Sequence, residues 1–179
     1  TLLALSKELQ LHLSGATIAV SFTQQKNELL LSCRPSDGSF EFMFAISVEP
    51  KSNYCYLKTS FSRAKKSSYD LFPALIGRTI RHVDVVPFDR TLQIGVDGDF
   101  EIVVQLYNTT GSNVLLVNAA GSIVEAFKND KDLAGTTYER KVPGFDHRAM
   151  ADAVAFVRSV LSDPSRTMIS AVRGALPIF

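Results

Sequence analysis

Short segments of alternating apolar and polar residues, separated by turn residues, fill most of the chain. Alternation with period two is typical of half-buried β-strands. Turn signals such as Asp37-Gly38 and Asp97-Gly98-Asp99 recur at hairpin spacing, which favours antiparallel sheets. The segments expected to be strands are 17–22, 28–33, 40–46, 54–57, 79–86, 90–96, 100–107, 114–117 and 122–127.

Helical spacing replaces this alternation in three places. Leucines at positions 2, 5, 9 and 13 form one apolar stripe, and Gly15 ends the predicted N-terminal helix. A short inserted helix is predicted over 69–76, and two more helices over 147–161 and from Pro164 onward. The predicted fold is therefore α+β: a mostly antiparallel β-sandwich with an N-terminal and a short inserted helix, followed by a C-terminal helical segment.

A change of composition near Lys128 suggests the domain organisation. We expect a β-sandwich domain over 1–128, a polar linker over 129–145, and the start of a helical domain over 146–179. The apolar faces of the last two helices have nothing left to pack on, so we expect a fragment of a longer protein. A two-helix appendage on the sheet is the alternative.

Composition narrows the protein class. Hydrophobic residues make up 46% of the 179, which is enough for a core, but no apolar run is long enough to span a bilayer. Cys33 and Cys55 are too few for a disulfide framework and are expected to be reduced, partly buried thiols. The start of the chain lacks a signal-peptide pattern, so we expect a cytoplasmic protein with no membrane partner.

The net charge of +1 conceals an uneven distribution. Between Lys51 and Arg81 there are seven basic residues and one acidic residue, Asp70, so this segment carries +6. Such asymmetry is typical either of an anion-facing surface or of a solvated basic loop. Four aromatic residues interleave with the cations and could stack on unpaired bases. For Phe61 and one of Tyr54 and Tyr56, we expect a side chain that faces the core instead.

Catalytic patterns are scarce. Three dispersed histidines show no metal-ligand spacing, and no nucleophile elbow, phosphate-binding loop or dinucleotide fingerprint occurs. Asp97 and Asp99 are explained by turn chemistry. We therefore expect no enzyme activity, catalytic residue, metal or cofactor. Asp89-Arg90, after Pro87, is either an ordinary turn or a recognition pair, in which Asp89 aims Arg90 or accepts from a base while Arg90 contacts a phosphate.

The order of motifs resembles the N-terminal domain of the NFACT family, the fibronectin-binding-protein-A-like proteins and related ribosome-quality-control factors. The resemblance covers nearly the whole chain. It is carried by the helix 5–13 with Ser14-Gly15-Ala16-Thr17-Ile18, by 27–31, by Phe88-Asp89-Arg90, by 111–117 and by Gly121-Ser122-Ile123-Val124, Arg140 and Pro143-Gly144. Two features depart from the family: segment 69–77 lacks its Arg-Lys pair, and the coiled coil and C-terminal domain are absent from this sequence.

The resemblance implies a fold related to the N-terminal lobe of formamidopyrimidine-DNA glycosylases. It also implies binding of tRNA at the large ribosomal subunit during rescue of stalled nascent chains, without catalysis by this domain. The residues expected to bind RNA are Asp89, Arg90, Lys58, Arg63, Lys65, Lys66, Arg78 and Arg81. The alternatives are a fibronectin-binding adhesin-like protein and a glycosylase-like enzyme, the latter disfavoured because no N-terminal Pro-Glu is present.

Overall fold

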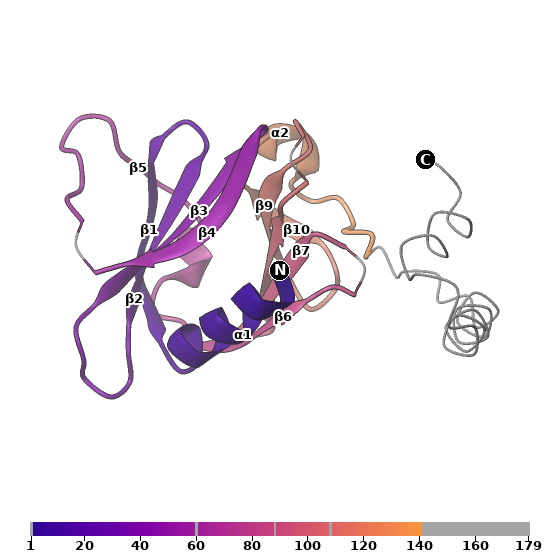
Figure 1. Cartoon of the computed structure of the whole chain (residues 1–179). Coiled ribbons are helices and arrows are strands. Elements are labelled where there is room, and N and C mark those ends of the chain that lie inside the picture. Colours follow the sequence, from indigo (N-terminus) through magenta and orange to yellow (C-terminus); the bar gives the residue numbers. More distant parts are fainter. Residues whose placement is uncertain (1, 60, 88, 108, 141–179) are drawn as a thin grey trace, which may run out of the picture. The chain divides into compact units, whose positions relative to one another are not determined.

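Ten strands in the described part of the chain form two antiparallel sheets of five strands each (Figure 1). The computed structural model describes residues 2–59, 61–87, 89–107 and 109–140, all within one compact unit that spans Thr1–Arg140. The predicted α+β class and the mostly antiparallel β-sandwich are confirmed. The predicted helices over 147–161 and from Pro164 lie outside the described residues.

The first sheet, called sheet A, has the strand order β4-β3-β2-β1-β5. Its strands are β1 (Thr17–Gln25), β2 (Glu28–Arg34), β3 (Phe42–Glu49), β4 (Ser52–Lys58) and β5 (Tyr69–Asp70). Sheet B has the order β10-β9-β8-β7-β6. Its strands are β6 (Ile80–Val85), β7 (Thr91–Val96), β8 (Phe100–Gln105), β9 (Asn113–Val117) and β10 (Ile123–Ala126). Both sheets consist largely of hairpins between consecutive strands, as the turn spacing predicted.

The main apolar core combines inward-facing residues of the two sheets. Leu29, Leu31 and Phe44 come from sheet A, and Ile94 and Leu116 from sheet B, and all are fully buried. Complete burial of such a side chain stabilises the fold by about 1.5–3 kcal/mol. Because successive side chains of a strand point to opposite faces, the residues between these positions lie on the outer faces of the sheets.

A register shift in β1 decides which residues face outward. The pairing with β2 slips between Ile18 and Val20, so Ile18 lies in the main core and Phe22 packs on the outer face of sheet A. There Phe22 joins a smaller buried cluster with Leu30 and Met43. Such a bulge reverses the orientation of every residue after it, and strict alternation does not predict it.

Helix α1 (Leu2–Leu13) confirms the predicted leucine stripe. Leu9 and Leu13 are buried in the main core. Gly15 ends the turn after the helix at a φ of 81°, a conformation that only glycine adopts without strain. Its N–H donates to the Ile80 carbonyl at 2.8 Å, which connects the end of the helix to β6.

The predicted helix over 69–76 is wrong in its first half. Tyr69–Asp70 extend and pair with the edge of β1, and only the short 3₁₀ turn η1 (Pro73–Leu75) follows. Phe72 adopts a φ of 50°, and the proline after it disfavours the α conformation there. Pairing to a free sheet edge therefore replaces the local helical preference.

Residues 129–140 pack against sheet B. The short helix α2 (Asp130–Leu133) contacts β10, and the Tyr138 N–H donates to the Gly121 carbonyl at 2.7 Å. The predicted division into a domain, a linker and a helical start stays a prediction.

Cys33 and Cys55 are buried and unbridged, as expected. Burial raises the pKa of each thiol to about 12, and the nearby Glu41 adds to the rise for Cys33. Both therefore stay protonated and are poor nucleophiles. Among the described residues, no helix is both long and apolar enough to cross a lipid bilayer.

Candidate functional site

Asp89 and Arg90 form the turn between β6 and β7. The Asp89 carboxylate is occupied within the protein: Oδ1 accepts the Arg90 backbone N–H at 2.6 Å, and Oδ2 accepts the hydroxyls of Thr91 at 3.2 Å and Tyr107 at 3.3 Å. Thr91 is fully buried. Asp89 therefore closes the turn and anchors it to the edge of the core. Both of its carboxylate oxygens are engaged by groups of the protein itself.

A chain of hydrogen bonds continues from this turn toward sheet A. The Tyr107 N–H donates to Ser112 Oγ at 3.1 Å, and the buried Ser112 hydroxyl donates to Asn53 Oδ1 at 3.2 Å. Asn53 belongs to β4, so side chains connect the turn of sheet B to the edge of sheet A. Sequence reasoning missed this network, although the resemblance over 111–117 included Ser112.

Arg90 differs from its neighbour. Its carbonyl accepts the Leu106 N–H at 2.8 Å, which fixes the backbone. Its side chain is exposed and makes no hydrogen bond or ion pair with the described part of the chain. The guanidinium is therefore available to a ligand, whereas the Asp89 carboxylate that was expected to aim it holds the backbone instead.

Two other predicted RNA-binding arginines are occupied by the fold. The guanidinium of Arg78 lies 4.5 Å from the centroid of the Phe100 ring and donates to the carbonyls of Ala74 at 2.5 Å and Asp97 at 3.0 Å. Arg81 donates from Nε to Asp97 Oδ1 at 2.5 Å, and this bond lowers the pKa of Asp97. Arg78 is only partly accessible, whereas the side chain of Arg81 is 60% exposed.

The connection over 58–68, called the basic loop, holds the other four predicted cations. Arg63 donates to Asp70 at 2.7 Å and to Ser68 at 2.6 Å, and its guanidinium lies 4.6 Å from the ring centroid of Phe22. Lys65 and Lys66 are exposed and have no ion pair within the described residues. Arg63 thus fastens the loop to sheet A, and the two lysines are left to solvent.

The aromatic residues near this loop face outward. We expected Phe61 and one of Tyr54 and Tyr56 to face the core, and this prediction is wrong: they are 44%, 46% and 38% exposed. Cys55 and Leu57 fill the inward positions of β4, so both tyrosines point from its outer face. The two rings, called the tyrosine pair, lie 5.6 Å apart between centroids at 47°.

A cation already contacts the tyrosine pair. Lys58 Nζ lies 5.4 Å from the centroid of the Tyr56 ring and 3.3 Å from its hydroxyl oxygen. Tyr69, in β5, is 69% exposed. The outer face of sheet A and the basic loop beside it therefore present aromatic rings and ammonium groups together.

The eight predicted residues do not form one site. Figure 1 shows the basic loop beside β5 on one side of the molecule and the turn between β6 and β7 on the other. The loop is fastened to β1 and β5 of sheet A, and Asp89 to Thr91 of β7 and to Tyr107, which follows β8. The predicted RNA-binding residues are close in the sequence, but the fold places them on separate surfaces.

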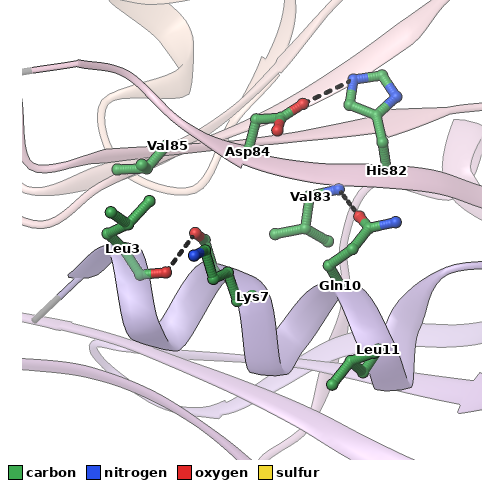
Figure 2. A pocket seen from close by; sticks show the side chains of 9 residues that line it. Leu3, Lys7, Gln10, Leu11, His82, Val83, Asp84 and Val85 are labelled. Atoms are coloured by element: carbon green, nitrogen blue, oxygen red, sulfur yellow. Dashed lines mark hydrogen bonds and ion pairs between the residues drawn. The ribbon is translucent and has the colours of Figure 1, made fainter.

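A groove between α1 and β6 has a volume of about 560 Å³ (Figure 2). Gln10 Oε1 accepts the Val83 N–H at 2.5 Å, and this bond joins the helix to the strand. His82 and Asp84 lie 3.8 Å apart at its rim, with side chains 52% and 72% exposed. Nothing in this exposed pair provides the desolvation that catalytic groups need.

No group of three or more His, Cys, Asp or Glu side chains that could hold a metal ion occurs in the described part of the chain. The described histidines, His12 and His82, lie on α1 and β6. The expectation of no metal or cofactor remains a prediction.

Comparison with known proteins supplies a fold relationship. No family model and no curated protein matches this sequence. Several solved structures match, and three of them are as follows. The N-terminal domain of the fibronectin-binding protein PavA from Streptococcus pneumoniae matches with 20% identity and a TM-score of 0.68, over 86% of this chain and 67% of that one.

The second is the N-terminal part of the fibronectin/fibrinogen-binding protein from Streptococcus suis, with 22% identity and a TM-score of 0.63, over 75% of this chain and 57% of that one. The third is a fibrinogen-binding protein from Staphylococcus aureus, with 17% identity and a TM-score of 0.60, over 75% and 52%. This chain therefore spans about half to two thirds of these chains and shares their fold.

Proposed function

We propose that this chain is an RNA-binding module with no catalytic activity of its own. The observation that carries the proposal is the tyrosine pair on the outer face of sheet A, with Lys58 against one ring. The exposed Lys65 and Lys66, which form no ion pair within the described residues, lie in the adjoining loop. Exposed rings can stack on unpaired bases, and ammonium groups neutralise phosphates. By the resemblance to NFACT, the RNA is tRNA or RNA of the large ribosomal subunit, bound in the cytoplasm.

Arg90 is a separate part of this proposal. Its guanidinium has no partner in the described chain and lies in the turn before β7 of sheet B, so it would contact a different stretch of the same RNA from the basic loop. An extended ligand such as tRNA could reach both places. In this arrangement Asp89 acts only by fixing the backbone of Arg90, through the hydrogen bond to its N–H.

Fluorescence anisotropy with labelled tRNA tests the proposal. Affinity should fall steeply as salt is raised, and Lys65→Glu with Lys66→Glu should weaken binding about tenfold, because two phosphate contacts are reversed. Lys7→Glu with Lys131→Glu reverses two exposed lysines elsewhere and is the matched control. Arg90→Glu reports separately on the sheet B contact. Equal affinity of the loop variant and the control would refute the basic loop as the RNA site.

A fibronectin- or fibrinogen-binding module is the second candidate. The three solved structures carry these ligands in their names, so the comparisons favour this function over RNA binding, whereas the surface chemistry favours RNA. Surface plasmon resonance on immobilised fibronectin and fibrinogen separates the two candidates. Saturable binding that survives high salt, together with no tRNA binding, would support the second candidate and reject the first.

A further inference from the structure

A pocket of about 470 Å³ opens at the end of sheet A that bears Glu28 and Glu49. It lies on the outer face: Glu28, Ser47 and Tyr54 face one another across β2, β3 and β4 in register. Directly opposed residues point to the same side of a sheet, which places a carboxylate, a hydroxyl and an aromatic ring in one row.

Glu28 is the unusual member of this row. Its residue is only 6% exposed, yet its carboxylate makes no hydrogen bond or ion pair with the described part of the chain. Among the described residues, Ser21 Oγ is the single side-chain polar atom that is both closed off from solvent and without a hydrogen bond. The unpaired oxygens of Glu28 are therefore not closed off, and they are accessible from the pocket. A carboxylate that opens into a pocket without a partner in the described chain can accept charge-assisted hydrogen bonds from a cationic ligand.

The remaining walls suit a cation. Asn27 Nδ2 donates to Glu49 Oε2 at 2.5 Å, which holds the second carboxylate at the rim and leaves Oε1 free among the described residues. Ser47 Oγ accepts the Glu49 N–H at 3.4 Å and has a second lone pair for a ligand, and Tyr54 presents an exposed ring. The neighbouring ring of Tyr56 already attracts Lys58, which shows that this aromatic surface accommodates cations.

The nearby cations of the protein do not neutralise the site. Lys26 lines the pocket, but its ammonium forms no ion pair within the described residues. Lys128 lies outside the lining and donates to the Val48 carbonyl at 2.6 Å. Burial lowers the pKa of Lys128, and the nearby charge of Glu49 offsets this only in part. Lys128 therefore lies close to the pocket without occupying it.

We propose that this pocket binds an arginine side chain of a partner polypeptide. A guanidinium is planar, carries several donors and is weakly hydrated, so it can satisfy Glu28, Ser47 and Glu49 together while its face lies against Tyr54. An ammonium is more strongly hydrated and presents no flat face. The site shares Tyr54 with the tyrosine pair of the proposed RNA surface, whose cations lie at the Tyr56 end and in the basic loop, and its test does not depend on the proposed function.

Heteronuclear NMR with the whole chain tests the proposal, with acetyl-Gly-Arg-Gly-amide as the probe. The amides of Glu28, Ser47 and Tyr54 should shift and saturate. The same peptide with citrulline, which is isosteric but neutral, should cause no saturable shift. Absence of saturation with the arginine peptide, or equal shifts with citrulline, would overturn the proposal.

Matched variants locate the contact. Glu28→Gln keeps the shape but removes the charge and should weaken the peptide about tenfold, as expected for loss of a charged hydrogen bond. Glu8→Gln, at an exposed position of α1, should leave the affinity unchanged. If Glu28→Gln does not fold, Glu49→Gln at the exposed rim takes its place with the same expectation. Unchanged affinity in the folded pocket variant would contradict the assignment.

Discussion

Asp89 and Arg78, beside sheet B, and Lys65 and Lys66, in the basic loop beside sheet A, differ in how the fold uses their charges. On sheet B, Asp89 and Arg78 make several contacts each with backbone or buried groups. On the sheet A side, Lys65 and Lys66 make none in the described chain. A charged side chain contributes to folding when hydrogen-bond partners of the protein surround it. A charged side chain without such partners is available to a ligand. Local sequence composition does not separate the two situations.

Arg78→Ala should cause the largest loss of stability in this comparison. The change removes the stacking on Phe100 and two hydrogen bonds to carbonyls, and we expect a loss of about 2–3 kcal/mol. Urea denaturation measures it. Arg34→Ala, which removes an exposed arginine 3.5 Å from Glu41, is the control and should cost less than about 0.5 kcal/mol. Equal midpoints for the two variants would contradict the structural role of Arg78.

Asp89→Ala should destabilise the protein by about 2 kcal/mol, because the Arg90 N–H loses its side-chain acceptor and the buried Thr91 hydroxyl keeps only its hydrogen bond with the Tyr107 hydroxyl. Asp132→Ala, an exposed substitution in α2, should change stability little. If Asp89 only fixes the turn, tRNA affinity measured well below the unfolding transition should fall less than with Arg90→Glu. A larger loss of affinity would show that Asp89 contacts RNA directly.

Acid should weaken the Arg81–Asp97 pair on sheet B. The Arg81 hydrogen bond lowers the pKa of Asp97 below its ordinary value of 3.8. A carboxyl with a lower pKa in the folded state stabilises the fold above its unfolded pKa, and this contribution is lost as the pH falls through the folded pKa. Asp97→Asn should therefore make stability less dependent on pH below about 4 in thermal melts, whereas Asp132→Asn should not.

Lys65→Ala with Lys66→Ala should have the smallest effect on stability, within about 0.5 kcal/mol, since exposed lysines without partners contribute little. The same variant should lose tRNA affinity severalfold in the anisotropy assay. If this variant lost as much stability as Asp89→Ala, Lys65 and Lys66 would contribute to folding as Asp89 does, and the comparison would be wrong.

Part of the candidate site could be anticipated from the sequence. The excess of cations between Lys51 and Arg81 and their interleaving with aromatic residues were visible directly. The outward orientation of both Tyr54 and Tyr56 could also follow from alternation, because Cys55 between them is apolar and suited to the core. The role of Asp89 was foreseen only as one of two possibilities, since its partner Tyr107 is distant in the sequence.

Other features required contacts that are remote along the chain. Phe22 faces outward because of a bulge, and Tyr69–Asp70 extend because β1 offers a free edge. Glu28 and Tyr54 flank Ser47 because β3 lies between their strands. Each depends on the pairing of neighbouring strands, which local propensity does not specify.

The amino-acid sequence by itself determined the α+β class, the hairpin succession and the helix α1, because turn residues and hydrophobic periodicity act over a few positions. Tertiary structure decided which charges remain free. Asp89, Arg78 and Arg81 are held by groups that the sheets bring close, whereas Lys65 and Lys66 meet none in the described chain. Hydrogen bonds depend on distances of about 3 Å, and only the folded chain sets such distances between remote residues.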